Sequence, residues 1–359
     1  MVVFGTRPEA IKMAPLVKAL EKDSRFKPIV VVTGQHRQML DQVLKVFSIT
    51  PDYDLNIMEQ EQTLTSITMK VLAELDAVLK IERPDMVLVH GDTTTTFSAS
   101  LSAFYNQIAI GHVEAGLRTW DKYSPFPEEM NRQLTDVMTD LYFAPTNQSK
   151  ENLLKENHPD NKIFVTGNTA IDAMRYTVTD EYNADILSKD KKNILITMHR
   201  RENLGESMEN VFHAVNRLVA EFEDIQVIFP IHKNPAVRKL AADTLTKTDR
   251  IKIIEPLDVI DFHNIASRCY LILTDSGGVQ EEAPSLGVPV LVLRDTTERP
   301  EGIAAGTLKL VGTEEDSVYK STKELLLNME LYKKMSTAKS PYGDGYASER
   351  ILDAIYSSL

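Results

Sequence analysis

Acidic side chains recur at the ends of predicted strands in the first half of the chain. Asp92 stands two residues after His90 at the end of one apolar run, and Glu114 stands two residues after His112 at the end of the next. Because side chains alternate along a strand, each histidine shares a face with its acid. Glu128 falls in the first turn of a predicted helix. Neighbouring carboxylates raise one another's proton affinity, so the sequence predicts acid–base groups at these three positions.

Two other interpretations of these residues stay open. Glu128 and Arg132 are four residues apart, a spacing that also suits a simple surface ion pair. The His-x-Asp and His-x-Glu pairs resemble metal ligands, but no third and fourth ligands are evident. We therefore predict no metal.

A second cluster follows an apolar run late in the chain. Ser276, Gly277 and Gly278 lie between a predicted strand and a predicted helix, followed one turn later by Glu282. A helix N-terminus with glycines directs backbone N–H groups and a positive dipole end at one point, which suits a diphosphate. Glu282 is placed to accept hydrogen bonds from ribose hydroxyls. An ordinary βα turn is the alternative interpretation.

Cations and histidines follow other predicted strands. Arg7 and Lys12 come after the first strand, whereas His199 and Arg200 follow a strand of the second half, and His232 follows the next one. At the carboxyl ends of parallel strands such side chains are able to contact a diphosphate and a sugar hydroxyl. For an isolated histidine, a surface position is the alternative.

The elements that position these residues form two series of strands alternating with helices. We predict an α/β fold of two Rossmann-like, doubly wound parallel-sheet domains with the active site in the cleft between them. The predicted first domain spans 1–170, with a C-terminal helix at 344–359 packing back on it, and the second spans 171–343. Neither a GxGxxG nor a GxxxxGK[ST] motif occurs, which argues against a dinucleotide site and a P-loop.

Composition limits the partners and the compartment. The net charge of −12 argues against nucleic acids and anionic membranes as partners. No apolar run approaches the length of a membrane span. The single cysteine, Cys269, excludes an intramolecular disulfide and favours a reducing, cytoplasmic location.

Eight motifs together carry a resemblance to a known family. They are FGTRPEAIKMAPL, GQHRQMLDQV, HGDTTTT, VEAGLRT, PEEMNR, HRREN, TDSGGVQEEAPSLGVPVL and RDTTERPE. In this order they resemble the bacterial non-hydrolysing UDP-N-acetylglucosamine 2-epimerases. That resemblance implies the fold of the B-type glycosyltransferases. It also implies reversible epimerisation at C2 between UDP-N-acetylglucosamine and UDP-N-acetylmannosamine, without a redox cofactor, in the supply of cell-surface polysaccharides or teichoic acids.

The resemblance also implies a mechanism and a quaternary structure. UDP is eliminated to leave 2-acetamidoglucal and is then re-added as a proton reaches the opposite face of C2. Members are usually homodimers and are activated by UDP-N-acetylglucosamine bound beside the active site. The family normally has residues before the first motif, so a short first strand is expected.

Residue roles follow from the matching motifs. The catalytic residues implied are Asp92, Glu114, Glu128 and His199. The substrate and UDP ligands implied are Arg7, Lys12, Arg132, Ser276, Gly277, Gly278, Glu282 and Arg294. The allosteric UDP-N-acetylglucosamine contacts implied are Gln35, Gln38, Arg200 and His232.

Three other functions remain open on this sequence. A hydrolysing epimerase would release UDP and free N-acetylmannosamine. Whether the cleft closes and excludes water decides between this reaction and the non-hydrolysing one. A glycosyltransferase on the same scaffold would need an acceptor pocket. A non-catalytic nucleotide-sugar sensor would need the Ser-Gly-Gly turn but not the three acids.

Overall fold

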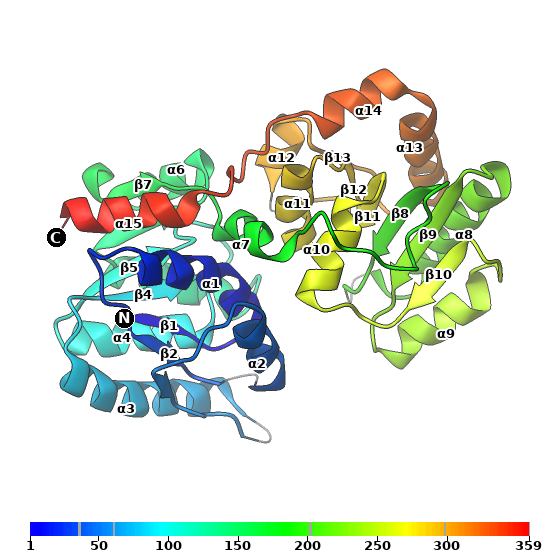
Figure 1. Cartoon of the computed structure of the whole chain (residues 1–359). Coiled ribbons are helices and arrows are strands. Elements are labelled where there is room, and N and C mark those ends of the chain that lie inside the picture. The colour runs from blue at the N-terminus through cyan, green and yellow to red at the C-terminus, as the bar shows by residue number, and fades with distance from the viewer. Residues whose placement is uncertain (35–36, 60–61, 201–202, 298, 359) are drawn as a thin grey trace. The chain divides into compact units, whose positions relative to one another are not determined.

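The computed structural model describes residues 1–34, 37–59, 62–200, 203–297 and 299–358. The chain divides into two compact units, Met1–Tyr176 with Tyr342–Leu359, and Thr177–Pro341 (Figure 1). Among the described residues, no helix combines the length and apolar character that crossing a membrane requires.

The first unit contains a seven-stranded parallel sheet in the order β3-β2-β1-β4-β5-β6-β7. Its strands are β1 (Val2–Phe4), β2 (Val30–Val32), β3 (Tyr53–Asp54), β4 (Met86–His90), β5 (Ala109–Val113), β6 (Leu141–Ala144) and β7 (Ile163–Val165). Its α-helices are α1 (Arg7–Lys22), α2 (Arg37–Val46), α3 (Leu64–Glu82), α4 (Thr94–Tyr105), α5 (Glu128–Met138), α6 (Asn147–Lys155), α7 (Thr169–Thr177) and α15 (Ala347–Ser358).

Both faces of this sheet are covered by helices. Along β1, Val2 and Phe4 pack into a layer with α1, α2 and α15, and Val3 packs into the opposite layer with α3 and α4. Strands buried on both faces must be apolar throughout, which explains their Val-rich sequences. All strands run parallel, so their carboxyl ends share one edge of the sheet, and this edge positions the acids predicted to act in catalysis.

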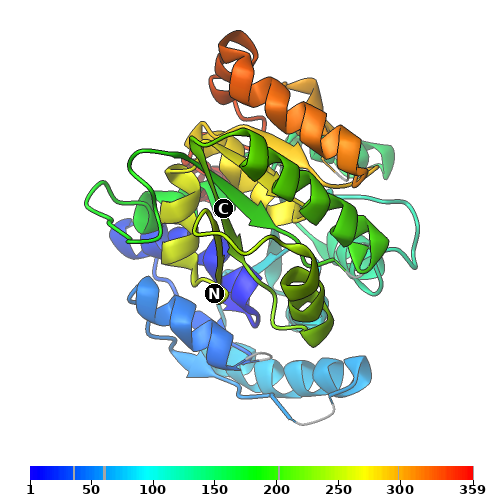
Figure 2. The same cartoon turned by 90° about the vertical axis from the view of Figure 1, so that its right-hand side faces the viewer.

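The second unit repeats this architecture with a six-stranded parallel sheet in the order β10-β9-β8-β11-β12-β13 (Figure 2). Its strands are β8 (Lys192–Thr197), β9 (Ile225–Pro230), β10 (Ile251–Ile254), β11 (Leu271–Thr274), β12 (Val290–Val292) and β13 (Leu308–Leu310). Its α-helices are α8 (Glu206–Glu221), α9 (Pro235–Thr244), α10 (Val259–Ser267), α11 (Gly277–Glu282), α12 (Pro300–Ala304), α13 (Glu315–Leu327) and α14 (Met329–Ser336).

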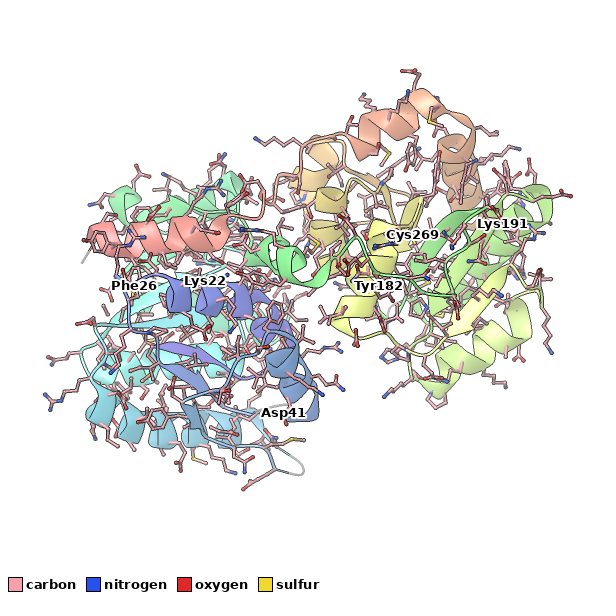
Figure 3. The ribbon with its side chains drawn as sticks, in the orientation of Figure 1. Lys22, Phe26, Asp41, Tyr182, Lys191 and Cys269 are labelled. Atoms are coloured by element: carbon pink, nitrogen blue, oxygen red, sulfur yellow. The ribbon has the colours of Figure 1, made fainter. Side chains whose placement is uncertain are left out.

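Two layers again enclose the sheet of the second unit. Leu271 and Leu273 of β11 pack with α8, α9 and α13, whereas Ile272 between them packs with α10 and α11. Cys269 is buried just before this strand (Figure 3), and burial raises the pKa of its thiol. The thiol is therefore a packing residue rather than a nucleophile.

The predicted fold class, two doubly wound parallel-sheet domains, is confirmed. The sequence pattern predicts strands at 2–4, 28–33, 86–90, 109–113, 193–197, 226–229, 251–254, 270–274 and 288–293. Four strands of the structure have no counterpart among these: β3, β6, β7 and β13. Three of them are sheet edges or are only two or three residues long, too short for a clear pattern. The second unit begins at Thr177, whereas the sequence predicted its start at residue 171. The difference arises because Ala173 of α7 packs into the core of the first unit.

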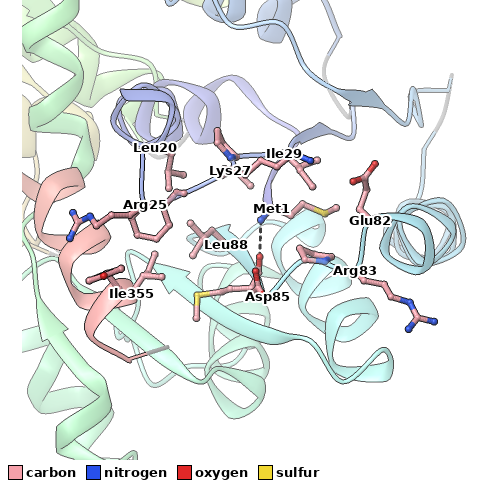
Figure 4. A pocket seen from close by; sticks show the side chains of 16 residues that line it. Met1, Leu20, Arg25, Lys27, Ile29, Glu82, Arg83, Asp85, Leu88 and Ile355 are labelled. Atoms are coloured by element: carbon pink, nitrogen blue, oxygen red, sulfur yellow. Dashed lines mark hydrogen bonds between the residues drawn. The ribbon is translucent and has the colours of Figure 1, made fainter. Parts of the chain in front are cut away.

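A pocket of about 580 Å³ lies at the amino ends of β1 and β4 in the first unit (Figure 4). There the Met1 ammonium donates a hydrogen bond of 2.7 Å to the carbonyl of Met86. Burial lowers the pKa of this ammonium to about 6. The pocket is at the edge of the sheet opposite the acids that follow β4 and β5.

Candidate active site

Glu114 is the most tightly held acid of the first unit. It follows β5 at a backbone φ of +65°, a left-handed conformation that costs a non-glycine residue about 1–2 kcal/mol. One oxygen of its carboxylate, Oε2, accepts hydrogen bonds from Lys12 and, at 3.0 Å, from Asn168 Nδ2. Nε2 of His90 lies 3.6 Å from the same oxygen.

These contacts determine the charge of Glu114. Burial alone would raise the pKa of the carboxyl, but Lys12 and His90 hold it well below its usual range. Glu114 is therefore an ionised carboxylate, and its Oε2 already accepts hydrogen bonds. The other oxygen, Oε1, lies 3.7 Å from the place that a Cβ on Gly91 would occupy, and so faces the turn that carries Asp92.

Asp92 lies in the turn between β4 and α4 and is held by α5. Arg132 Nη2 donates to its carboxylate at 2.7 Å, and Asn131 Nδ2 donates to its backbone carbonyl at 2.9 Å. Asp92 and Glu114 thus each have a cationic partner, in place of the mutual repulsion expected from the sequence. Each of the two side chains is therefore paired with a cation after its own strand, Asp92 after β4 and Glu114 after β5.

Glu128 begins α5 and is half-buried. The Glu128–Arg132 ion pair considered from the spacing is not among the contacts of the described residues, because Arg132 pairs instead with Asp92 and, at 3.5 Å, with Glu129. Glu129 accepts the backbone N–H groups of Thr119 and Trp120. Glu128 is therefore not held by its helical neighbour.

The turn that carries Asp92 is also tied to the start of α1. Glu9 is buried, and one of its oxygens accepts the N–H groups of Gly5 and Thr6 while the other accepts the hydroxyl groups of Thr93 and Thr96. Arg7 is exposed at the first residue of the same helix. Hydrogen bonds through Glu9 therefore join the turn after β1 to the turn that carries Asp92.

In the second unit, buried Asp275 organises the loop that carries His199. Its carboxylate accepts the N–H groups of His199 and Arg200 and the side-chain amide of Asn203, at 2.9 to 3.2 Å. Burial raises the pKa of Asp275, but the hydrogen bonds from His199 and Arg200 outweigh it and lower the pKa. The ring of His199 is half exposed and stacks on His232, with the centroids 6.3 Å apart.

The predicted anion turn begins immediately after Asp275. Ser276 is the N-cap of α11 and makes no side-chain capping bond, so the first-turn N–H groups lack the usual capping acceptor. A Cβ on Gly277 would lie 2.7 Å from Arg299 Nη1, whereas one on Gly278 would meet nothing closer than 3.8 Å. Arg299 is itself held by buried Glu281 at 2.9 Å. The turn therefore suits an anion, with a cation directly beneath it.

The remaining predicted ligands of the second unit lie around this turn or after neighbouring strands. Glu282 is on α11, and its Oε2 lies 3.4 Å from Nε2 of buried His263. Arg294 follows β12 and is half-buried. Their roles as ligands stay predictions.

The predicted allosteric residues fall in both units. Arg200 and His232 belong to the second unit, where Arg200 Nε donates to the Asp275 carbonyl at 3.0 Å. Gln35 lies outside the described residues. Gln38 is in α2, but its side chain is likewise outside them.

His90 was expected to share a face with Asp92, but its Nε2 lies 3.6 Å from Oε2 of Glu114. Several other residues that hold the predicted acids and turns were missed at the sequence level. They are Glu9, Asn131, Asn168, Asp275 and Arg299. Only Asp275 carries a local signal, since an acid directly before a small-residue turn at a strand end is well placed to gather backbone N–H groups. In the parts of the chain described here, no group of three or more His, Cys, Asp or Glu side chains is arranged to hold a metal ion.

Comparison with known proteins places this geometry in a family. A family model described as UDP-N-acetylglucosamine 2-epimerase matches residues 18–356. The UDP-N-acetylglucosamine 2-epimerase of Bacillus subtilis (strain 168) is 63% identical over 357 residues, which cover 99% of this chain and 94% of that protein.

Solved structures agree with this similarity. A crystal structure of UDP-GlcNAc 2-epimerase from Neisseria meningitidis bound to UDP-GlcNAc matches with a TM-score of 0.90 at 49% identity, covering 99% of each chain. The Methanocaldococcus jannaschii enzyme in complex with UDP-GlcNAc and UDP matches with a TM-score of 0.80 at 36% identity, again covering 99% of each chain.

The two parallel-sheet units and these neighbours define an epimerase, and hence an isomerase, of the B-type glycosyltransferase-like fold. The chain belongs to the UDP-N-acetylglucosamine 2-epimerase family. The membership and the enzyme class expected from the eight motifs are thereby confirmed.

Proposed function

We propose that this chain interconverts UDP-N-acetylglucosamine and UDP-N-acetylmannosamine by the non-hydrolysing route. The observation that carries the proposal is the ionised carboxylate of Glu114, held by Lys12 and Asn168 and facing the Asp92 turn. Relatives whose structures contain UDP-GlcNAc or UDP support the choice of substrate.

The proposed reaction has two halves. A carboxylate removes the C2 proton, the C1–O bond breaks, and UDP leaves with the electron pair to give 2-acetamidoglucal. UDP then re-adds at C1 through the same oxygen while a proton is delivered to the opposite face of C2. The atoms balance without an oxidant, a reductant or a metal, so no redox cofactor is proposed.

In this proposal the two units have different tasks. Asp92, Glu114 and Glu128 move protons, with Arg132 keeping the Asp92 carboxylate in place. Ser276, Gly277 and Gly278 hold the diphosphate, the two glycines through backbone N–H groups, while Glu282 binds the ribose and the cations Arg7 and Arg294 balance phosphate charge. His199 contacts the diphosphate and the sugar. Lys12 is better supported as the counterion of Glu114 than as a phosphate ligand, because its ammonium is bonded to that carboxylate.

Product analysis distinguishes this proposal from its rivals. The protein is incubated with UDP-N-acetylglucosamine, and the products are followed by proton and phosphorus NMR. We expect a mixture of the two UDP-sugars from either starting epimer. Accumulation of UDP with free N-acetylmannosamine would indicate hydrolysis, and no reaction without an added acceptor would indicate a glycosyltransferase or a sensor.

We also propose that UDP-N-acetylglucosamine activates the enzyme at a second site formed by Gln35, Gln38, Arg200 and His232. The family resemblance supports this assignment. Sigmoidal dependence of the rate on UDP-N-acetylglucosamine, and its requirement for the reverse reaction, are the expected results. A strictly hyperbolic response with no activation of the reverse reaction would contradict it.

A homodimer in the cytoplasm, supplying UDP-N-acetylmannosamine for surface polysaccharide or teichoic-acid synthesis, completes the proposal. The adjoining helices α4 and α5 expose apolar side chains that suit a contact between copies. They are Phe104, Tyr105, Leu134 and Val137. Size-exclusion chromatography with light scattering should give twice the mass of the chain. Val137→Glu should lower the measured mass toward that of the monomer.

A further inference from the structure

His112 lies inside β5 with no exposed side-chain surface, and both of its ring nitrogens have partners. Nδ1 lies 2.6 Å from Asp136 Oδ1, and Nε2 lies 2.7 Å from the backbone carbonyl of Gly91. A carbonyl only accepts, so Nε2 must carry a proton. Burial alone would raise the pKa of Asp136, but His112 and Arg118 lower it, so Asp136 is an ionised acceptor as well. Nε2 therefore donates to the Gly91 carbonyl, and Nδ1 is hydrogen-bonded to Asp136.

Charged side chains on other elements extend these contacts. Arg118 donates to the second oxygen of Asp136 at 2.6 Å and also, at 2.9 Å, to Glu156, the residue that follows α6. His158 lies 3.5 Å from Glu156 at the outer end of the chain of contacts. The buried carboxylate of Asp136 thus lies between His112 and Arg118. A buried ion network of this kind often adds little stability compared with apolar packing, so its role is better sought in geometry.

The inner end of the network is the turn that carries Asp92. Gly91 has φ of +67°, which glycine adopts without a steric penalty, and its carbonyl is the acceptor of the His112 bond. Asp92 follows directly, with its own carbonyl held by Asn131 and its carboxylate by Arg132. The peptide groups on both sides of Asp92 are therefore fixed by hydrogen bonds from buried side chains.

One helix supplies most of this support. Asn131, Arg132 and Asp136 are all on α5, the helix that begins at Glu128. The contacts to Asp92 and to His112 therefore fix the turn after β4 against the helix that carries another of the acids. A change at either contact alters the placement of Asp92 relative to Glu128 without touching substrate.

We propose that His112 is a positioning residue for the epimerisation, and that its Nε2–H group holds the Gly91 carbonyl so that Asp92 keeps a fixed place relative to Glu128. This inference rests on the proposed function. Misplacing a reacting group by about 1 Å costs on the order of 100-fold in rate, so the loss is expected in kcat rather than in substrate binding.

Two substitutions at this position separate the two hydrogen bonds. The amide of glutamine extends as far as Nε2, so His112→Gln keeps a donor for the Gly91 carbonyl and loses the one for Asp136. The shorter amide in His112→Asn does the reverse. We expect His112→Asn to lower kcat about 100-fold and His112→Gln about tenfold or less, with KM and the Kd of UDP unchanged. His213→Asn, an exposed histidine on α8, is the matched control and should leave kcat unchanged.

Two further measurements keep the test decisive if His112→Asn unfolds. Asp136→Asn leaves Nε2 of His112 able to donate to the Gly91 carbonyl, so it should lower kcat about tenfold or less, as His112→Gln does, and a loss of about 100-fold would contradict the inference. In the wild-type protein labelled with ¹⁵N-histidine, NMR should show one histidine, absent from the His112→Gln spectrum, with a proton on Nε2.

Folded His112→Asn with kcat within threefold of wild type would overturn the inference. Equal losses in the Asn and Gln variants that follow their loss of thermal stability would do the same, and so would a His112 ring without a proton on Nε2. A wild-type protein that does not interconvert the UDP-sugars would instead contradict the proposed function.

Discussion

The two units hold their functional residues by different means. In the first unit, Glu114 and Asp92 are each held by charged or amide side chains from elements distant in sequence, such as Lys12 and Arg132. In the second unit, Asp275 accepts backbone N–H groups, and Ser276, the N-cap of α11, makes no side-chain capping bond to the first turn of that helix.

This difference matches two kinds of chemistry. Proton transfer needs carboxylates of fixed charge and position, which long-range ion pairs supply. Diphosphate binding needs several donors that converge on one point and accommodate a ligand, which a helix start with small residues supplies. We therefore propose that the first unit carries the catalytic acids and the second unit most of the nucleotide contacts, and substitutions should separate the two functions.

The largest effect is expected from neutralising the acids. Asp92→Asn and Glu114→Gln should each lower kcat by about 10²- to 10⁴-fold, because they remove acid–base groups. Calorimetric titration should show that both variants bind UDP as the wild type does. Asp160→Asn, an exposed acid of the same unit, is the control. A large loss of UDP affinity in the first two variants would break the proposed separation.

Removing Lys12, the counterion of Glu114, should change the pH dependence of kcat/KM. In Lys12→Met the charge of Lys12 no longer opposes burial, so the pKa of Glu114 should rise. The carboxylate is then lost at a higher pH, and the acidic limb of the profile of kcat/KM should move to higher pH. Lys80→Met on α3 provides the control, since its ammonium pairs only at the surface with Asp76. An unmoved limb would show that Lys12 does not set the charge of Glu114.

Asp275→Asn should affect the second unit instead. The neutral amide no longer accepts all the N–H groups that converge on it, which should cost about 1.5–3 kcal/mol of unfolding free energy and weaken UDP binding. Folding lowers the pKa of Asp275 despite its burial, so its contribution is complete above the ordinary aspartate range and is lost as the pH falls through the folded value. Urea unfolding from pH 3 to 7 should show that the free energy of unfolding depends less steeply on pH in the variant than in the wild type. Equal dependence on pH in the two proteins would contradict this account.

The smallest effect is expected at the glycines of the turn. In Gly277→Ala the new methyl group would overlap the Arg299 guanidinium, which Glu281 holds, at a cost of about 1 kcal/mol. Gly278→Ala has room for its methyl group and should unfold at the wild-type temperature. Differential scanning calorimetry compares the two. Equal melting temperatures would show that Arg299 is not constrained beneath the turn.

The sequence predicted the fold and the positions of the acids because both depend on local pattern. Apolar runs of four or five residues reveal buried parallel strands, and the acids come directly after them. The two-residue strand β3 gives no such pattern. The family motifs added the assignment of a nucleotide sugar, which no spacing could supply.

The partners of the acids could not be predicted because they depend on contacts between distant segments. Lys12 is 102 residues from Glu114, and Arg132 is 40 residues from Asp92. The short-range alternative, an ion pair between Glu128 and Arg132, had the right helical spacing, but Arg132 turns toward the neighbouring loop. The network from Glu156 to His112 likewise joins three elements that only the fold brings together.

Isotope exchange at C2 tests the central claim, that the acids of the first unit transfer a proton at the carbon beside the anomeric centre. The protein is incubated with UDP-N-acetylglucosamine in deuterated water, and both UDP-sugars are examined by NMR and mass spectrometry. The account predicts one deuterium at C2 of the epimer formed, with incorporation suppressed in Glu114→Gln. Epimerisation that leaves the original hydrogen at C2 would contradict it.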